Sequence, residues 1–262
     1  MRRKYHILSL IALLLTVSAC QTIDLNRVGS LLKNTATLVG DNSSKEVEIG
    51  TGMAARLVDV APLVEIDSLQ SKVNIVGTWL SLHLDPDSSW DWKFAVIDSA
   101  DINAFATPAG YILITRGLIE QVGDDHELAG VIAHEMAHVT GRHYVKGIKL
   151  EAGLGLAGDL ASMATENEEY SSHIDKAVSA GTELWSRGLD KKLEFECDRN
   201  AVVLAARSGY DPYGLVAVLQ SLEAMDAGDS SLALLFKSHP KPSERLEQLA
   251  QVIAGSEQLA GL

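Results

Sequence analysis

Residues 124–141 read DDHELAGVIAHEMAHVTG, which has the pattern of one continuous, well-capped helix. Asp124 is a residue whose side chain can accept hydrogen bonds from the free amides at a helix start, and Glu127 follows three positions later, as in a capping box. Only Gly130 weakens the rest of the run. The stretch therefore predicts a helix that carries His-Glu-Met-Ala-His at positions 134–138.

These five residues form an HExxH motif, in which two histidines lie one helical turn apart on the same face. His134 and His138 can therefore bind one small tetrahedral cation, and Glu135 beside them can take a proton from a water held by it. The surrounding residues are apolar, which favours a buried site over a surface helix with two unrelated histidines. A shared metal ion is a reason to bury two imidazoles together.

The first 19 residues have the pattern of a secretory signal peptide. Three basic residues precede an apolar run that is too short to span a membrane comfortably, which also disfavours an uncleaved anchor. The run ends in Val-Ser-Ala-Cys and resembles the bacterial lipobox, so we expect Cys20 to be lipidated; the alternative is an ordinary signal with a fortuitous cysteine. Gln21 follows, which favours the outer membrane over the inner one. We expect a periplasmic, lipid-anchored protein with a tether at residues 20–45 and one domain at residues 46–262.

The composition limits the partners of this chain. It has 22 Lys and Arg against 35 Asp and Glu, a formal net charge of −13. This acidic balance argues against nucleic acid as a partner and against a basic membrane-binding face, so membrane attachment must come from the lipid. The chain has two cysteines, so with Cys20 lipidated Cys197 has no intramolecular disulfide partner.

A small sheet is predicted just before the HExxH helix. Residues 92–98, 102–106 and 111–115 read as strands, and Thr-Pro-Ala-Gly joins the last two. Zinc peptidases commonly hold their substrate as an added strand, so we expect the 111–115 strand to be a substrate-pairing edge with Leu113 and Thr115 as substrate-binding residues. The alternative is a hairpin that serves only as scaffold.

The rest of the chain is mostly helical by pattern. The Gly-rich segment 147–164 is either a mobile element or a poorly packed surface helix, and residues 165–172 are expected to form a loop. The predicted fold class is α+β, mostly α, with a small β-sheet beside the HExxH helix. The other predicted helices cover residues 46–60, 68–83, 117–122, 189–208, 212–227 and 243–253.

Two acidic residues interrupt an apolar stripe on the 189–208 helix. Glu194 and Asp198 are one turn apart, and Cys197 shares their face. Glu194 is either a solvated residue near two lysines or the third ligand of a His-His-Glu zinc site, in which Asp198 accepts from the far nitrogen of a ligand histidine. We expect Cys197 to be a small core residue and not a ligand.

The remaining histidines are distributed along the chain. His126, His143 and His173 are expected to be surface or structural residues. His239 lies in the rigid turn Ser-His-Pro-Lys-Pro at residues 238–242, far in sequence from the HExxH helix.

Several segments together resemble one family, the periplasmic zinc metallopeptidases of the LoiP and BepA type, within the wider CAAX-prenyl-protease and HtpX superfamily. The resemblance covers about Glu46 to the C-terminus, and its motifs occur in the family order. The segments that carry it are Asn103–Gly110, Gly117–Leu118, His134–His138 with Arg142–His143, Glu194–Arg199, Gly209–Pro212, and Ser238–Pro240 with Arg245.

The resemblance implies a zincin-like metallopeptidase domain that binds one Zn²⁺ per chain through His134, His138 and Glu194. It implies that Glu135 is the general base of a gluzincin-like zinc metalloendopeptidase. His239 would approach the metal from the far side and either block it at rest or stabilise the oxyanion. Such relatives act on unfolded or misassembled envelope proteins, so we expect such proteins as substrates.

This chain departs from the family at two places. The family usually has Ala where this chain has Cys197, and the segment before Glu194 is more basic than expected. A rival interpretation is a zinc-stabilised, chaperone-like or binding lipoprotein with little proteolysis. The presence of Glu135 disfavours it, because a structural zinc site needs no base.

Overall fold

The structure of the chain is a computed structural model that describes residues 42–85, 90–156, 167–225 and 228–260. The predicted signal peptide, the lipidated Cys20 and nearly all of the predicted tether lie outside these residues. Among the described residues, no helix is both long enough and apolar enough to cross a membrane.

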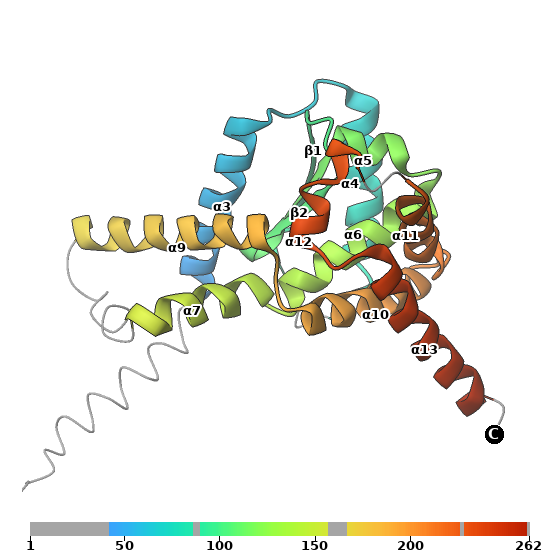
Figure 1. Cartoon of the computed structure of the whole chain (residues 1–262). Helices are drawn as coiled ribbons and strands as arrows, with labels where there is room; N and C mark the ends of the chain where they lie inside the picture. The colour runs from blue at the N-terminus through green and yellow to red at the C-terminus, as the bar shows by residue number, and fades with distance from the viewer. Residues whose placement is uncertain (1–41, 86–89, 157–166, 226–227, 261–262) are drawn as a thin grey trace, which may run out of the picture. The chain divides into compact units, whose positions relative to one another are not determined.

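Helices make up most of the described chain and surround one three-stranded sheet (Figure 1), which confirms the mostly helical α+β prediction. The strands are β1 (Lys93–Ile97), β2 (Ala104–Thr107) and β3 (Tyr111–Thr115). The helices are α3 (Asn42–Val60), α4 (Asp67–Ser81), α5 (Arg116–Gln121), α6 (Asp125–Thr140), α7 (His143–Leu156), α9 (Asn167–Arg187), α10 (Lys191–Arg207), α11 (Gly214–Ala224), α12 (Leu235–Ser238) and α13 (Pro242–Ala260).

The HExxH helix α6 lies at the centre of this arrangement. It packs against the sheet and against α4, α10 and α11, and every residue from Leu128 to Val139 is buried. Asp124 caps it by accepting from the amides of His126 and Glu127, while the Glu127 carboxylate accepts from the amide of Gly123 at 2.7 Å. The predicted cap and helix are confirmed, and the burial shows that both histidines of the motif lie inside the protein.

The sheet has the order β1-β3-β2, with β3 parallel to β1 and antiparallel to β2. The expectation that residues 111–115 form a substrate-pairing edge is therefore wrong, because β3 is hydrogen-bonded on both sides. Leu113 and Thr115 are only 3% and 1% exposed. The Thr115 hydroxyl instead donates to the Asn103 carbonyl at 2.8 Å and caps α5, so both residues serve the scaffold.

One expectation about the second half of the chain is wrong, and another is tested only in part. Residues 167–172, expected in a loop, form the first part of α9. The Gly-rich segment is helical up to Leu156, where α7 packs beside α9, and its remaining residues lie outside the described chain. Gly147 allows this packing, because a Cβ there would lie 2.8 Å from the Leu184 side chain.

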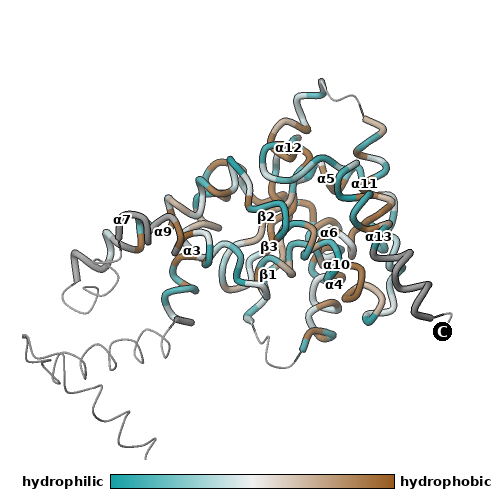
Figure 2. The backbone as a smooth tube through the Cα atoms, turned by 60° about the horizontal axis from the view of Figure 1, so that its bottom comes forward, coloured by the Kyte–Doolittle hydropathy of each residue, from teal (hydrophilic) through white to brown (hydrophobic). Residues whose placement is uncertain are grey.

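The hydrophobic core lies between the sheet and the central helix. Figure 2 shows apolar segments gathered around the strands. Ile112 and Ile114 of β3 are fully buried together with Leu128, Ile132 and Met136 of α6. Burying an aliphatic side chain of this size contributes about 1.5–3 kcal/mol, so this layer holds α6 against the sheet.

Gly130 marks the close approach of α6 and α11, and its replacement tests this packing. A Cβ at Gly130 would lie 2.5 Å from the backbone nitrogen of Leu215. Gly130→Ala should lower the free energy of unfolding by about 1–3 kcal/mol, measured by urea denaturation, because the two backbones must separate. Gly123→Ala is the control, since its Cβ would meet only the flexible Glu127 carboxylate at 3.3 Å. Equal losses in both variants would contradict the close approach.

Candidate metal centre

Three segments that are far apart in the sequence meet at the buried face of α6. This helix carries His134, Glu135 and His138, while α10 brings Glu194 and the end of α12 brings His239. All five side chains are at most 8% exposed. The structure therefore brings together the proposed ligands, the proposed base and His239.

The donor atoms of three of these residues have the spacing of a tetrahedral site. His134 Nε2 and His138 Nε2 are 3.3 Å apart, His138 Nε2 and Glu194 Oε1 are 3.4 Å apart, and His134 Nε2 and Glu194 Oε2 are 3.6 Å apart. Ligands bonded to zinc at about 2.0–2.1 Å in a tetrahedron lie about 3.3–3.4 Å from one another. These distances fit ligands around a common ion.

The Glu194 carboxylate supports the same conclusion. Both of its oxygens are buried, and neither has a hydrogen-bond partner. A buried, unpaired carboxylate is costly, and it would be expected to have a compensating charge or to be protonated. Neighbouring imidazoles hold the pKa of Glu194 well below its usual range despite burial, so it is anionic. Once His134 has lost its proton to bind a metal, this anion between two neutral imidazoles is a fitting donor set for a divalent cation.

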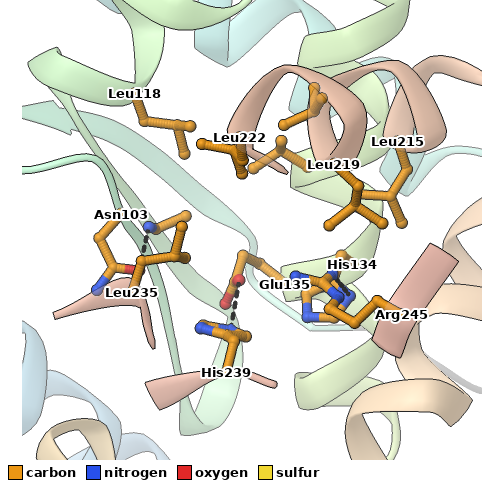
Figure 3. Close-up of a pocket in the computed structure, with 13 residues that line it drawn as sticks. Asn103, Leu118, His134, Glu135, Leu215, Leu219, Leu222, Leu235, His239 and Arg245 are labelled. Atoms are coloured by element: carbon orange, nitrogen blue, oxygen red, sulfur yellow. Dashed lines mark hydrogen bonds and ion pairs between the residues drawn. The ribbon is translucent and has the colours of Figure 1, made fainter. Parts of the chain in front are cut away.

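His239 faces this set from the opposite side. Its Nε2 lies 3.7 Å from Glu194 Oε2 and 3.8 Å from Glu135 Oε1, and Figure 3 shows His239 opposite Glu135. Together with His134, His138 and Glu194, it places four donor atoms within 4.8 Å of one another. His239 is thus able to occupy the fourth position around the ion.

Asp198 and Arg245 orient His134. Asp198 Oδ1 accepts from His134 Nδ1 at 2.8 Å, which leaves Nε2 free to face Glu194. Arg245, on α13, donates to both oxygens of Asp198. A carboxylate that holds the far nitrogen of a ligand histidine is a common support of metal sites. The family resemblance singled out Arg245, but no local sequence signal predicted its contact with Asp198, because α13 meets α10 only in the folded chain.

His143 stands in the corresponding position behind His138. The Nδ1 atoms of the two rings are 3.3 Å apart, and the Cys197 sulfur lies 3.4 Å from the same His143 nitrogen. With His138 Nε2 bound to a cation, its Nδ1 would carry the proton and donate to His143. The sequence placed His143 among surface or structural residues, and the structure buries it beside a ligand. Cys197 is fully buried, and its sulfur lies behind His143.

Burial controls the protonation of the site in the absence of a cation. It raises the pKa of Glu135 to about 7 and lowers the pKa of His138 well below its usual value. It also lowers the pKa of His239 to about 4. Burial disfavours the charged form of His134, but Asp198 and Glu194 outweigh it and raise that pKa to about 9. A bound cation favours the carboxylate form of Glu135, because opposite charges attract.

Strand β2, and not β3, borders this centre. Asn103 and Thr115 exchange hydrogen bonds across the sheet, so Ala104 and Ala106 direct their polar backbone groups away from β3. The backbone of Ala106 hydrogen-bonds Glu135, and its carbonyl accepts from the Trp185 indole at 3.1 Å. Much of the outer edge of β2 is therefore engaged within the chain.

Comparison with known proteins agrees with this geometry. Residues 68–253 match the family described as Peptidase family M48. The chain is 28% identical to the beta-barrel assembly-enhancing protease of Escherichia coli (strain K12) over 207 residues, which cover 77% of this chain and 42% of that protein. The chain is also 29% identical to the mitochondrial metalloendopeptidase OMA1 of Arabidopsis thaliana over 161 residues, which cover 61% of this chain and 31% of that protein.

A shorter relative is also similar. The metalloprotease LoiP of Escherichia coli (strain K12) is 28% identical over 157 residues, which cover 60% of this chain and 61% of that protein. The chain thus spans less than half the length of the first two relatives and under two thirds of this one.

The buried pair of Asp198 and Arg245 should matter more for stability than an exposed pair between the same two helices. Asp198→Asn leaves the Arg245 guanidinium without its counter-charge and should lower the free energy of unfolding of the metal-free protein by about 3–5 kcal/mol. Glu244→Gln breaks the pair of Lys191 and Glu244, whose side chains are 62% and 41% exposed, and should cost about 0–1 kcal/mol. Urea denaturation measures both, and similar losses would contradict a structural role for the buried pair.

Replacing His143 should weaken metal binding through His138. His143→Ala removes the acceptor that orients the His138 ring and should reduce zinc affinity about 10–100-fold in a chelator competition assay. His126→Ala is the matched control, because His126 is an exposed histidine on the first turn of α6, the helix that carries His138. Unchanged affinity in His143→Ala would show that this residue only fills space.

Proposed function

This chain belongs to Peptidase family M48, and from that premise we propose that it is a zinc-dependent endopeptidase of the bacterial cell envelope. It hydrolyses peptide bonds in unfolded or misassembled envelope proteins. The observation that carries the proposal is the unpaired, buried Glu194 carboxylate facing His134 and His138, with Glu135 beside them.

The donor set supports zinc as the metal. Two imidazole nitrogens and one carboxylate oxygen with tetrahedral spacing are typical of catalytic zinc sites, which keep one position open for water or substrate. His134, His138 and Glu194 would hold the ion. When bound in such a site, zinc acidifies a water molecule and polarises the peptide carbonyl.

Glu135 performs the proton transfers. Its carboxylate accepts a proton from the attacking water and returns it to the nitrogen of the departing amine. Burial raises its pKa to about 7 in the metal-free protein, close to the value at which a group can both accept and release a proton near neutral pH. The Ala106 backbone keeps the carboxylate in place through its hydrogen bond.

His239 sets the state of the site. We assign it to the fourth position at rest, since its Nε2 faces Glu194 and Glu135 and burial keeps it neutral. A neutral imidazole is a metal ligand, so in this position it excludes water and substrate. The ring must move away before hydrolysis, and in its displaced position it is a candidate donor to the oxyanion.

The proposed location and substrates rest on the relatives and the N-terminal sequence. One relative is named a beta-barrel assembly-enhancing protease, which associates that protein with the assembly of beta-barrels. The Val-Ser-Ala-Cys sequence at residues 17–20 supports export and lipidation of Cys20, with attachment to the outer membrane. An acidic protein on a lipid tether would act on proteins near the membrane surface.

The second candidate function is a zinc-stabilised, chaperone-like lipoprotein with little proteolysis. The position of His239 favours it, since a permanent fourth ligand would make the site structural. Glu135 opposes it, because a structural site gains nothing from a buried carboxylate that is not a ligand. Hydrolysis of unfolded casein by the zinc-loaded protein, abolished by a chelator, distinguishes the two.

The different roles of Glu135 and Glu194 give the sharpest test. Glu135→Gln keeps the shape but loses the base, so it should bind zinc normally and hydrolyse nothing measurable. Glu194→Gln loses the anionic ligand, so it should lose zinc affinity first and activity as a consequence. Zinc content by atomic absorption and casein hydrolysis are measured together, and excess zinc should restore some activity only to Glu194→Gln. Zinc lost in Glu135→Gln and kept in Glu194→Gln would show that the third ligand is misassigned.

A further inference from the structure

A small apolar cavity opens beside the metal centre (Figure 3). His134, Glu135 and His239 form part of its wall, so a group that fills it lies against the reacting bond. The rest of the wall is largely aliphatic and comes from α5, α6, α11 and the start of α12. The aliphatic side chains that matter here are Leu118, Val131, Leu215, Leu219, Leu222 and Leu235.

Away from the metal-centre residues His134, Glu135 and His239, the wall offers no free charge to a polar occupant. Arg245 also borders the cavity, but its guanidinium is already paired with Asp198. An ionised side chain placed among these leucines would lose its hydration without gaining a partner, which is strongly unfavourable. The cavity therefore selects for an apolar group.

Asn103 supplies one unused hydrogen-bond donor at the β2 side of the cavity. Its Oδ1 accepts from the Ala104 amide at 3.0 Å, which fixes the orientation of the side-chain amide. Its Nδ2 is buried and has no partner, and leaving such a donor unpaired costs about 1–3 kcal/mol. The neighbouring polar groups of Ala106 are already bonded to Glu135 and Trp185, so the Asn103 amide is the group on this edge that lacks an acceptor.

We propose that this cavity is the subsite for an aliphatic side chain of the substrate next to the scissile bond. Asn103 Nδ2 donates to a backbone carbonyl of the same stretch of substrate. The inference rests on the proposed peptidase function and adds to it a substrate preference. Aliphatic residues such as leucine are accepted at this position, and aspartate and lysine are rejected.

The size of the cavity links occupancy to the state of His239. In this structure the cavity measures about 30 Å³, where about 10–15 Å³ is enough to hold one water molecule. A leucine side chain needs more room. Leu235 lies on α12, and His239 follows this helix directly. Outward movement of α12 would widen the subsite and withdraw His239 from the metal centre together.

Cleavage-site profiling tests the preference in the active enzyme. The zinc-loaded wild type digests unfolded casein, and mass spectrometry of the products should show one position beside the scissile bond enriched in aliphatic residues. Leu222→Ala enlarges the cavity and should shift that position towards phenylalanine by about 10-fold or more, while Leu222→Met keeps the volume and should leave the profile unchanged. An identical profile in wild type and Leu222→Ala would overturn the proposal.

A binding experiment separates the subsite from catalysis. Zinc-loaded Glu135→Gln is titrated by calorimetry with two peptide hydroxamates that differ only in an isobutyl or a carboxymethyl side chain. The isobutyl compound should bind about 100-fold more tightly. Asn103→Asp keeps the acceptor for the Ala104 amide but removes the donor, so it should weaken binding of the isobutyl compound about 10-fold.

The outcomes of the two experiments are distinct. Discrimination between the hydroxamates by Glu135→Gln, together with no hydrolysis of casein by the zinc-loaded wild type, would support the subsite and reject the peptidase function. Hydrolysis of casein without discrimination between the hydroxamates would reject the subsite and leave the peptidase function standing. Asn103→Asp is made in the Glu135→Gln background. Equal binding of the isobutyl compound by this double variant and by Glu135→Gln alone would remove Asn103 from the proposal.

Discussion

The rest of the site depends on one buried carboxylate. Glu194 is held inside the protein without a hydrogen-bond partner, between two imidazoles of α6 and the imidazole of His239. Burying an anion without a hydrogen bond is costly, so Glu194 needs a compensating positive charge, which a protonated His134 can supply in the metal-free protein and a bound cation would supply in its place. The tight packing of α6 on α10 brings the carboxylate to this position.

The two histidines of the HExxH motif are supported from two sides by different chemistry. Asp198 and Arg245 form a charged, fully hydrogen-bonded pair behind His134, and this pair also joins α10 to α13. Behind His138 the support is neutral and consists of His143 and Cys197. His143 reaches this place because Arg142 adopts a left-handed conformation (φ 52°) between α6 and α7. Metal binding is thus linked to how α7, α10 and α13 pack around α6.

Access to the centre depends on the short helix α12. This helix carries Leu235 on the wall of the apolar cavity and is followed by His239, which faces Glu135 and Glu194. It packs on α9, and Gly188 at the end of α9 allows close approach, since a Cβ there would lie 2.7 Å from the Ser238 carbonyl oxygen. The same contact therefore positions His239 and limits the volume of the proposed subsite.

Features that depend on local interactions were predictable from the sequence. The cap at Asp124, the helical turn between His134 and His138, and the one-turn spacing of Glu194 and Asp198 all follow from helix geometry within a few residues. The three strands were also placed along the chain close to where the structure has them. These patterns were sufficient to predict the fold class and to make Glu194 a candidate ligand, while its assignment as the third ligand came from the family resemblance.

Only the tertiary structure decided which of these elements are neighbours. The order β1-β3-β2 places β3 in the middle and removes Leu113 and Thr115 from the candidate substrate contacts, because strand pairing is set by contacts between distant segments. The same reason applies to His143, whose position behind His138 depends on the turn between α6 and α7. Asn103 carries no sequence signal for its free amide, because whether a buried donor has a partner is a property of the assembled protein and not of its local sequence.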